Sequence, residues 1–231
     1  MNALSHLSAP ELASWFSSLY AANGGLPSGI IFDCDGVLID SREANIAYYN
    51  YLRQYIGLPP LPESQHDFVQ AGTVKEVLDV IIPMPLRPLI RDAVRKVSYV
   101  NDIMPRITHY PGLHGVLDFC KKANIRMGID TNRIDGMDIL LENCRLHGYF
   151  SPIILANSVP APKPAPDGAL TIAREWGLEP ASLLFIGDSS SDRGAAEKAG
   201  IPFLSFQTKG LAEHSVENFA TLREALQSFA L

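Results

Sequence analysis

The sequence predicts an α/β fold, in which a Rossmann-like parallel sheet carries helices on both faces and a small all-helical cap domain is attached. Two patterns support this prediction. From Tyr110 onward, apolar segments of strand length alternate with longer segments of helix length, which is typical of right-handed βαβ units in a parallel sheet. Between residues 43 and 108, helix-like segments are separated by prolines, without strand-like alternation.

The composition is that of a globular protein. The chain has 231 residues, of which 47% are hydrophobic and 19% charged, which is enough for a sizeable core. A net charge of −6 disfavours a nucleic acid polymer as partner, because such binding needs a basic face. An apolar stretch of about 18 residues and a signal-peptide pattern are both lacking, so we expect no membrane partner. Three scattered cysteines favour a cytoplasmic location, and we expect a monomer or a homodimer.

Residues 1–28 precede the first predicted strand and are expected to form an N-terminal helical extension. Pro10 suits the first turn of a helix that should run to Ala22. Its large apolar residues share one face, at Leu12, Trp15, Phe16 and Leu19. We expect this helix to dock on the main domain, and a dimerisation or partner helix is the alternative.

The first strand is predicted at Ile30–Phe32, an apolar run typical of a strand buried on both faces. Two carboxylates, Asp33 and Asp35, follow it directly, and Gly36 then allows the chain to turn sharply. One carboxylate can attack a phosphorus centre while the other handles protons. An ordinary Asp-rich turn is the alternative, and the later motifs favour the catalytic pair.

Residues 43–108 are expected to be the cap domain, inserted between the two parts of the catalytic core at 29–42 and 109–231. Hinges are expected near residues 41–44 and 106–111. The predicted helices of the cap are Glu43–Ile56, Gln65–Ala71, Lys75–Ile82 and Leu89–Asp102. Gly72 lies between the second and the third, and prolines separate the others.

The remainder of the core is predicted as alternating strands and helices. The expected strands are Ile125–Ile129, Ile153–Ala156, Leu183–Ile186 and Phe203–Phe206. The expected helices are Leu113–Ala123, Asp135–His147, Ala165–Trp176, Ser190–Ala199 and Thr221–Phe229.

Residues suited to catalysis follow several of the predicted strands. Asp33 ends the first strand, Thr131 and Asn132 come after the second, and Lys163 and Asp188 come after later ones. Ligands of an open parallel sheet bind outside the carboxyl ends of its strands. These side chains, although distant in the sequence, are therefore expected to meet at one edge of the sheet.

Their residue types suit phosphoryl transfer. Asp33 can act as nucleophile, and Asp35 can protonate the leaving alcohol and then deprotonate water. Thr131 can hydrogen-bond phosphoryl oxygens, and Lys163 can neutralise negative charge. Asp33 and Asp188 offer hard oxygen ligands for Mg²⁺, which lowers the repulsion between a carboxylate and a phosphate dianion.

Four ordered motifs carry a resemblance to a known family. The sequence resembles the haloacid dehalogenase superfamily, in the phosphatase branch that has a helical cap and includes phosphoglycolate phosphatases and β-phosphoglucomutases. The motifs are DCDGVLIDS at Asp33–Ser41, TNR at Thr131–Arg133, KPAPD at Lys163–Asp167 and GDSSSD at Gly187–Asp192. The resemblance covers roughly residues 29–231 and implies that family's core fold.

The resemblance also implies the role of each motif residue. Asp33 would be nucleophile and metal ligand, and Asp35 the acid/base, with its backbone carbonyl on Mg²⁺. Thr131 and Asn132 would bind phosphate, and Lys163 would stabilise charge.

For the last motif, the resemblance implies that Asp188 binds the metal directly. Asp192 would support the metal through water or by orienting Lys163. The presence of Asp35 favours phosphate-ester hydrolysis or phosphomutase chemistry, because displacement of a halide needs no proton donor.

Three cations are weaker candidates for substrate binding. The segment Gly72–Glu76 resembles a cap segment of sugar phosphomutases, and Lys75 within it is predicted to reach an anionic group of the substrate. A solvated helix lysine is the alternative. Arg42, next to a hinge, and Arg133, after the Thr-Asn pair, are predicted to line the cleft.

The sequence therefore predicts a Mg²⁺-dependent phosphatase that hydrolyses a small phosphorylated metabolite through an aspartyl-phosphate. A sugar phosphomutase is the alternative within the enzymes. A non-catalytic module that binds phosphometabolites is the alternative from another class, and the intact set of candidate catalytic residues disfavours it. Phosphoglycolate, a sugar phosphate and a nucleotide monophosphate all stay open as substrates.

Overall fold

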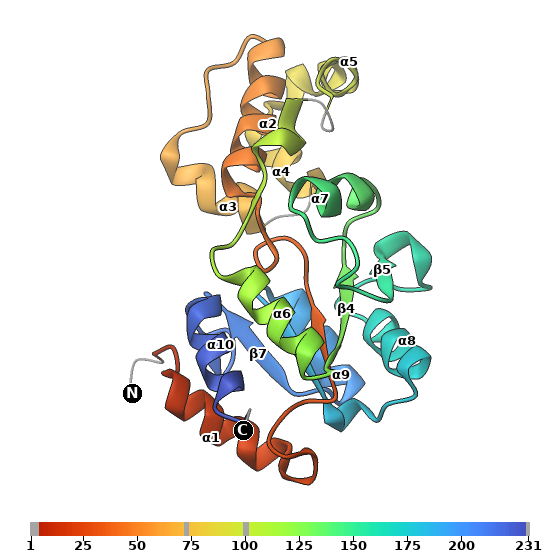
Figure 1. Ribbon diagram of the computed structural model, residues 1–231. Coiled ribbons are helices and arrows are strands. Elements are labelled where there is room, and N and C mark those ends of the chain that lie inside the picture. Colours follow the sequence, from red (N-terminus) through yellow and green to blue (C-terminus); the bar gives the residue numbers. More distant parts are fainter. Residues whose placement is uncertain (1–4, 72–73, 99–101, 230–231) are drawn as a thin grey trace.

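A six-stranded parallel sheet forms the centre of the molecule in a computed structural model that describes residues 5–71, 74–98 and 102–229 (Figure 1). The strand order is β5-β4-β1-β6-β7-β8, and every neighbouring pair is parallel. The strands are β1 (Gly29–Phe32), β4 (Arg126–Thr131), β5 (Ile153–Leu155), β6 (Leu183–Gly187), β7 (Phe203–Phe206) and β8 (Ser215–Val216). The predicted fold class is confirmed.

Strand β1 lies in the interior of the sheet because its residues are apolar on both faces. Ile30 and Phe32 point into the hydrophobic cluster on one face of the sheet, and Ile31 points into the cluster on the other. All three side chains are fully buried. Strand β1 pairs with β4 on one side and with β6 on the other, so its backbone groups are satisfied on both edges.

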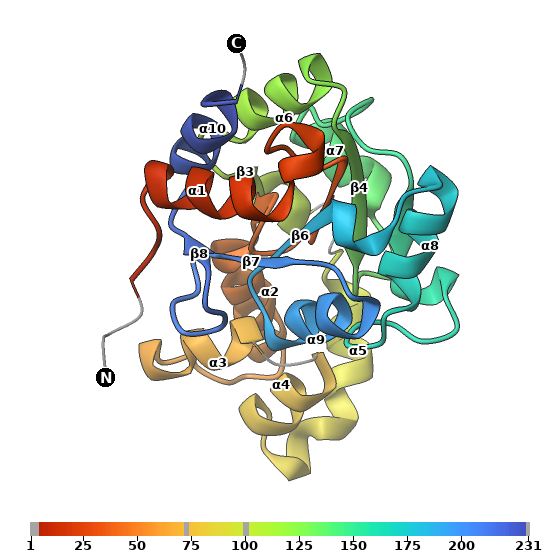
Figure 2. The ribbon, with the colours of Figure 1, turned by 90° about the horizontal axis from the view of Figure 1, so that it is seen from below.

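Helices cover both faces of the sheet, as Figure 2 shows with α1, α6 and α10 on one side and α9 on the other. Their apolar residues recur with helical spacing and close the two clusters over the strands. The helices of the core are α1 (Ala9–Leu19), α6 (Leu113–Lys122), α7 (Met137–Asn143), α8 (Asp167–Trp176), α9 (Ser190–Ala199) and α10 (Phe219–Gln227). A third hydrophobic cluster lies elsewhere, within residues 46–97.

Helix α1 is docked on the core, as expected for the N-terminal segment. Leu12 and Phe16 are fully buried in the cluster that also holds residues of α10, and the two helices are in contact. Trp15 stacks on His214 with ring centroids 4.3 Å apart. The apolar face of α1 is therefore covered by this chain itself, except at Leu19, which is 40% exposed. The helix ends earlier than predicted, at Leu19, and a 3₁₀ turn follows.

The segment between residues 43 and 108 is helical over most of its described length, and Figure 1 shows its helices gathered at the end of the molecule opposite α1. They are α2 (Arg42–Tyr55), α3 (His66–Ala71), α4 (Val74–Ile81) and α5 (Ile90–Lys96). Tyr49 and Leu52 of α2 pack with Val77 and Ile81 of α4 in the third cluster. The division of the chain into extension, core and cap domain stays a prediction.

Short 3₁₀ segments connect several elements. They are η1 (Ala21–Asn23), η2 (Glu63–Gln65), η3 (Met84–Leu89), η5 (Met104–Arg106), η6 (Ala156–Ser158) and η7 (Pro180–Ser182).

Two short strands that the sequence did not predict join the segments on either side of the helical region. Strand β2 (Ile39–Asp40) pairs antiparallel with β3 (Thr108–His109), so that Ile39 lies opposite His109 and Asp40 opposite Thr108. Two-residue strands are too short to show alternation of apolar and polar residues. The ribbon lies at the two expected hinges and joins their backbones.

Some predicted helix boundaries were wrong for local reasons. The predicted helix Leu89–Asp102 ends at Lys96 in the structure, and residues 99–101 lie outside the described ranges. The helix expected from Asp135 begins at Met137, because Gly136 adopts a left-handed conformation with φ of 71°. The final helix begins at Phe219, since the Asn218 side chain caps it by accepting a hydrogen bond from the Thr221 amide.

Within the described ranges, no helix combines the length and apolar character that crossing a bilayer requires.

Candidate active site

The candidate residues lie where the interior strands end. Asp33 follows β1, and its amide donates to the carbonyl of Ile186 in β6 at 2.9 Å. Thr131 is the last residue of β4, and Asp188 follows β6. Because these strands are parallel neighbours, their carboxyl ends bring Asp33, Thr131 and Asp188 to the same edge of the sheet.

Lys163 links two carboxylates of this edge. Its ammonium lies 2.6 Å from Asp33 Oδ1 and 2.5 Å from Asp192 Oδ1. Asp33, Lys163 and Asp192 are all buried, so these ion pairs are poorly screened by water. Asp33 and Lys163 are 130 positions apart in the sequence. The predicted meeting of these two residues is therefore seen in the structure.

The charges around Lys163 do not balance. Burial raises the pKa of Asp33 well above its ordinary value, although Lys163 opposes the rise. Burial also raises the pKa of Asp188 to about 7, and the neighbouring Asp192 adds to the increase. Burial favours a lower pKa for Lys163, but the carboxylates of Asp33 and Asp192 outweigh it and raise the pKa. One ammonium is surrounded by more carboxylates than it can neutralise.

The surplus of carboxylates fits a divalent cation. One oxygen each from Asp33, Asp188 and Asp192 lie within 4.8 Å of one another. Hard cations such as Mg²⁺ bind through one or two carboxylates and keep several waters. The group therefore has the donor type and the charge of a metal site.

Gly36 makes room for this group. It adopts a φ of +79°, which L side chains rarely adopt, and a Cβ at this position would lie 2.0 Å from Asp188 Oδ2. The turn after β1 therefore requires glycine both for its conformation and for the space that the Asp188 carboxylate occupies.

Asp192 is held by protein donors through both of its oxygens. Oδ1 accepts from Lys163, and Oδ2 accepts from the Ser189 amide at 3.0 Å and from the Ser189 hydroxyl. Ser189 in turn caps α9 by accepting from the Asp192 amide. This arrangement favours Asp192 as the residue that orients Lys163, one of the two supporting roles predicted for it.

Asp35 is paired with Arg133. The guanidinium donates from Nε to Asp35 Oδ2 at 2.7 Å and from Nη2 to Oδ1 at 3.2 Å. The carboxylate of Asp35 is thus directed at Arg133 and does not belong to the three-carboxylate group described above. The sequence suggested neither this pairing nor its direction.

Thr131 and Asn132 occupy different surroundings. Thr131 is buried, and its hydroxyl accepts from the amide of Arg133 at 3.2 Å. The Asn132 side chain donates to the backbone carbonyl of Lys163 at 3.1 Å, so it holds the loop that carries the lysine. The predicted role of both residues in phosphate binding stays a prediction.

The two cations outside the core motifs are placed as follows. The Lys75 side chain is 91% exposed, and its ammonium lies 3.7 Å from Asp79 on the same helix. Arg42 is the first residue of α2. Burial raises the pKa of Tyr110 to about 12, and the positive charge of Arg42 acts against this increase. The substrate contacts proposed for both cations stay predictions.

Asp130 is a buried carboxylate that sequence reasoning missed. It accepts a hydrogen bond from the Ala169 amide in the first turn of α8, while its Oδ2 has no partner in the structure. Burial raises the pKa of Asp130 to about 6. A Cβ at Gly168 would lie 2.2 Å from Asp130 Oδ1. The sequence feature that could have revealed Asp130 is a carboxylate placed between the apolar run that ends at Ile129 and Thr131.

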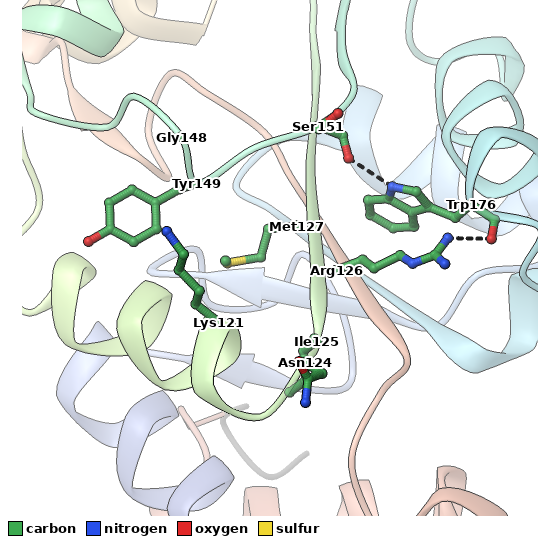
Figure 3. A pocket seen from close by; sticks show the side chains of 9 residues that line it. All are labelled: Lys121, Asn124, Ile125, Arg126, Met127, Gly148, Tyr149, Ser151 and Trp176. Carbon is green, nitrogen blue, oxygen red and sulfur yellow. Dashed lines mark hydrogen bonds between the residues drawn. The ribbon is translucent and has the colours of Figure 1, made fainter.

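A separate pocket of about 620 Å³ lies at the opposite, amino end of β4 (Figure 3). Lys121 lies over the Tyr149 ring at 5.6 Å, and Arg126 donates to the carbonyl of Trp176. Acidic residues are absent from the side chains that line it. The pocket therefore lacks the carboxylates that the predicted chemistry requires.

A family comparison agrees with this geometry. The model of the haloacid dehalogenase-like hydrolases matches residues 30–206, a range that includes every carboxylate of the site. The chain belongs to the haloacid dehalogenase-like hydrolases. The predicted family is confirmed.

Relatives of this haloacid dehalogenase-like chain include curated phosphatases. A phosphoglycolate phosphatase of Pseudomonas putida is 29% identical over 202 residues, which cover 81% of this chain and 71% of the relative. A phosphoglycolate phosphatase of Caulobacter vibrioides is 27% identical, and the match covers 87% and 86% of the two chains. These relatives support the predicted enzyme class, a phosphoric monoester hydrolase.

Solved structures of the family share the fold. A subfamily IA hydrolase of the superfamily from Geobacter sulfurreducens has a TM-score of 0.75 and 32% identity, covering 87% of this chain and 97% of that one. CbbY from Rhodobacter sphaeroides, solved in complex with phosphate, has a TM-score of 0.66 at 23% identity, with coverage of 85% and 96%.

Proposed function

We propose that the protein is a Mg²⁺-dependent phosphatase that hydrolyses a small phosphorylated metabolite through an aspartyl-phosphate. The observation that carries this proposal is the carboxylate group around Lys163. Asp33 lies at the end of an interior strand with its charge partly balanced by a buried ammonium 2.6 Å away. A rigidly held carboxylate in such surroundings suits nucleophilic attack on phosphorus.

The proposed reaction has two displacements at phosphorus. Asp33 attacks, the bond from phosphorus to the ester oxygen breaks, and Asp35 gives its proton to the leaving alcohol. Asp35 then takes a proton from water, which attacks the phosphorus and releases phosphate and free Asp33. Lys163 neutralises charge in both steps, and Thr131 and Asn132 bind the phosphoryl oxygens.

Asp33 and Asp188, with the backbone carbonyl of Asp35, are the proposed ligands of Mg²⁺. When bound, the metal supplies positive charge against which a carboxylate and a phosphate dianion can approach. Asp192, with both oxygens engaged by protein donors, supports the site by holding Lys163.

The first candidate substrate is 2-phosphoglycolate, because the curated relatives are named for it. The proposed location is the cytoplasm, and the described cysteines support it, since Cys34, Cys120 and Cys144 are all buried thiols without a disulfide.

The test is phosphate release from a panel of phosphorylated metabolites, with Mg²⁺ and with a chelator. We expect metal-dependent turnover by the wild type and none by Asp33→Asn, which keeps the shape of the side chain but is a poor nucleophile. Asp92→Asn, a change at an exposed α5 carboxylate, serves as the control and should retain activity. Full turnover by Asp33→Asn would contradict the proposed nucleophile.

A further inference from the structure

The proposed acid/base, Asp35, is directed at Arg133 in the conformation that the structure shows. Both of its carboxylate oxygens accept hydrogen bonds from Arg133, at 2.7 and 3.2 Å. A general acid must direct an oxygen toward the leaving group within hydrogen-bonding distance. Release of one contact with Arg133 would let Asp35 turn an oxygen toward a bound substrate.

The backbone of Arg133 is anchored on both sides. The Arg133 amide donates to Thr131 Oγ1, and its carbonyl accepts from the Ala156 amide at 2.9 Å. Beyond this anchored backbone, the side chain is long. Its exposed fraction is 11%, against 33% for its partner Asp35, so the pair lies at the accessible side of the site.

The other cation of the site is more deeply buried than Arg133. Lys163 is 2% exposed and bound to both Asp33 and Asp192, so it is committed to the reacting centre. A negatively charged group elsewhere on the substrate would therefore find its partner in Arg133. A guanidinium binds a carboxylate through two parallel hydrogen bonds, and a substrate carboxylate can replace the one that Asp35 provides.

We propose that Arg133 exchanges Asp35 for a second anionic group of the substrate, and thereby selects phosphate monoesters that carry a carboxylate. The inference rests on the proposed function and adds a specificity-determining residue to it. A second negative charge on the substrate replaces Asp35 as the partner of Arg133. Asp35 is then available for proton transfer. A neutral substrate offers no such compensation, and Asp35 stays engaged.

The test compares two esters that differ only in this group, 2-phosphoglycolate and 2-hydroxyethyl phosphate. For the wild type, we expect kcat/KM to favour 2-phosphoglycolate by roughly tenfold or more. Arg133→Met should lose this preference, because kcat/KM for 2-phosphoglycolate falls by a larger factor than kcat/KM for 2-hydroxyethyl phosphate. Arg133→Lys keeps the charge without the planar fork and should retain part of the preference.

Two controls make the result specific. Arg174→Met removes an arginine whose side chain bonds within its own helix, to Thr171 and Leu170, and should keep the wild-type preference. Thermal unfolding of each variant shows whether it is folded. The pair 3-phosphoglycerate and glycerol 3-phosphate repeats the comparison on a longer carbon chain.

The outcomes separate this inference from the function on which it rests. An Arg133→Met variant that loses the same factor on both esters would make Arg133 a permanent holder of Asp35 and would overturn the exchange. An equal kcat/KM of the wild type for both esters would overturn it as well. A wild type that releases phosphate from no ester, with no labelling of Asp33, would overturn the proposed function itself.

Discussion

Charge balance at single residues governs this site. Lys163 is the buried cation that faces the carboxylates of Asp33 and Asp192, and a buried charge is tolerated only with a partner. Removing one member of such a group costs more than the pair contributes, because the charges left behind stay buried without compensation. The same residues that prepare the site for a cation therefore make the fold sensitive to substitution there.

Lys163→Met should lower the free energy of unfolding by about 3–5 kcal/mol at pH 7 in the absence of divalent metal, because Asp33 and Asp192 lose their cation. The loss should shrink at pH 5, where protonation relieves the uncompensated charge. Urea unfolding at the two pH values measures this difference. Lys121→Met, at an exposed position on α6, is the control, and an equal loss at both pH values would contradict the explanation.

Because Asp130 is buried, the free energy of unfolding should depend on pH. Its pKa is raised from 3.8 to about 6 by burial, so between these pH values the folded chain keeps a proton that the unfolded chain has released. The contribution of Asp130 to the free energy of unfolding is therefore largest below about pH 4 and is lost as the pH rises to about 6. A shift of about 2 pKa units corresponds to about 3 kcal/mol.

Asp130→Asn should accordingly lose less stability than the wild type between pH 4 and pH 6. Urea unfolding at several pH values gives, for each protein, the slope of the free energy of unfolding against pH. Asp92→Asn replaces an exposed carboxylate of α5 and should leave the wild-type slope unchanged. Identical slopes for Asp130→Asn and the wild type would show that burial of Asp130 does not affect its titration.

At the scale of the element, the loop after β1 depends on a single glycine. The φ of +79° at Gly36, and the 2.0 Å that would separate an added Cβ from Asp188 Oδ2, leave no room for a side chain. The pairing of β1 with β6 places Asp33 beside the end of β6, and the loop at Gly36 packs directly against the Asp188 carboxylate.

Gly36→Ala should reduce kcat/KM by roughly 100-fold, because the added methyl group displaces the Asp188 carboxylate and small displacements of catalytic groups have effects of this size. The circular dichroism spectrum should stay that of the wild type. Gly57→Ala is a matched control, since Gly57 also has positive φ, at +82°, but a Cβ there meets no atom within 4 Å. Equal activity of the two variants would contradict this role of Gly36.

The sequence predicted those elements that are long enough to show a pattern. Strand β1 was found as a continuous apolar run, and helix α1 because its large apolar residues share one face. Strands β2, β3 and β8 were missed, because two residues carry no period. Helix ends were missed where a single residue decides them, as Gly136 does by its left-handed conformation.

At the scale of the whole molecule, the topology brings the site together. That Asp33, Thr131 and Asp188 would meet could be predicted, since parallel strands place their carboxyl ends at one edge. The pairing of Arg133 with Asp35 could not, because the direction of a long side chain depends on all of its neighbours. The burial of Asp130 was missed although the sequence places a carboxylate directly after the apolar run that ends at Ile129.

The docking of α1 belongs to this scale as well, because it buries Phe16 against elements from the other end of the chain. Phe16→Ala should lower the free energy of unfolding by about 3–5 kcal/mol through the cavity it leaves. The kcat/KM of the folded variant should not change. Leu19→Ala is the control on the same helix, since Leu19 is 40% exposed. A loss of stability no larger than that of the control would contradict the docking.

The interior position of β1 has a consequence for the order in which the protein loses structure. Partial unfolding begins at poorly protected edges and ends in segments that are paired on both sides, and β5 and β8 form the edges of this sheet. The amide hydrogens of β1 should be among the last to exchange with solvent, together with that of Asp33, which donates to β6. Asp33, the proposed nucleophile, thus follows a strand that should be among the last to unfold. Fraying of the outer strands should leave Asp33 in place.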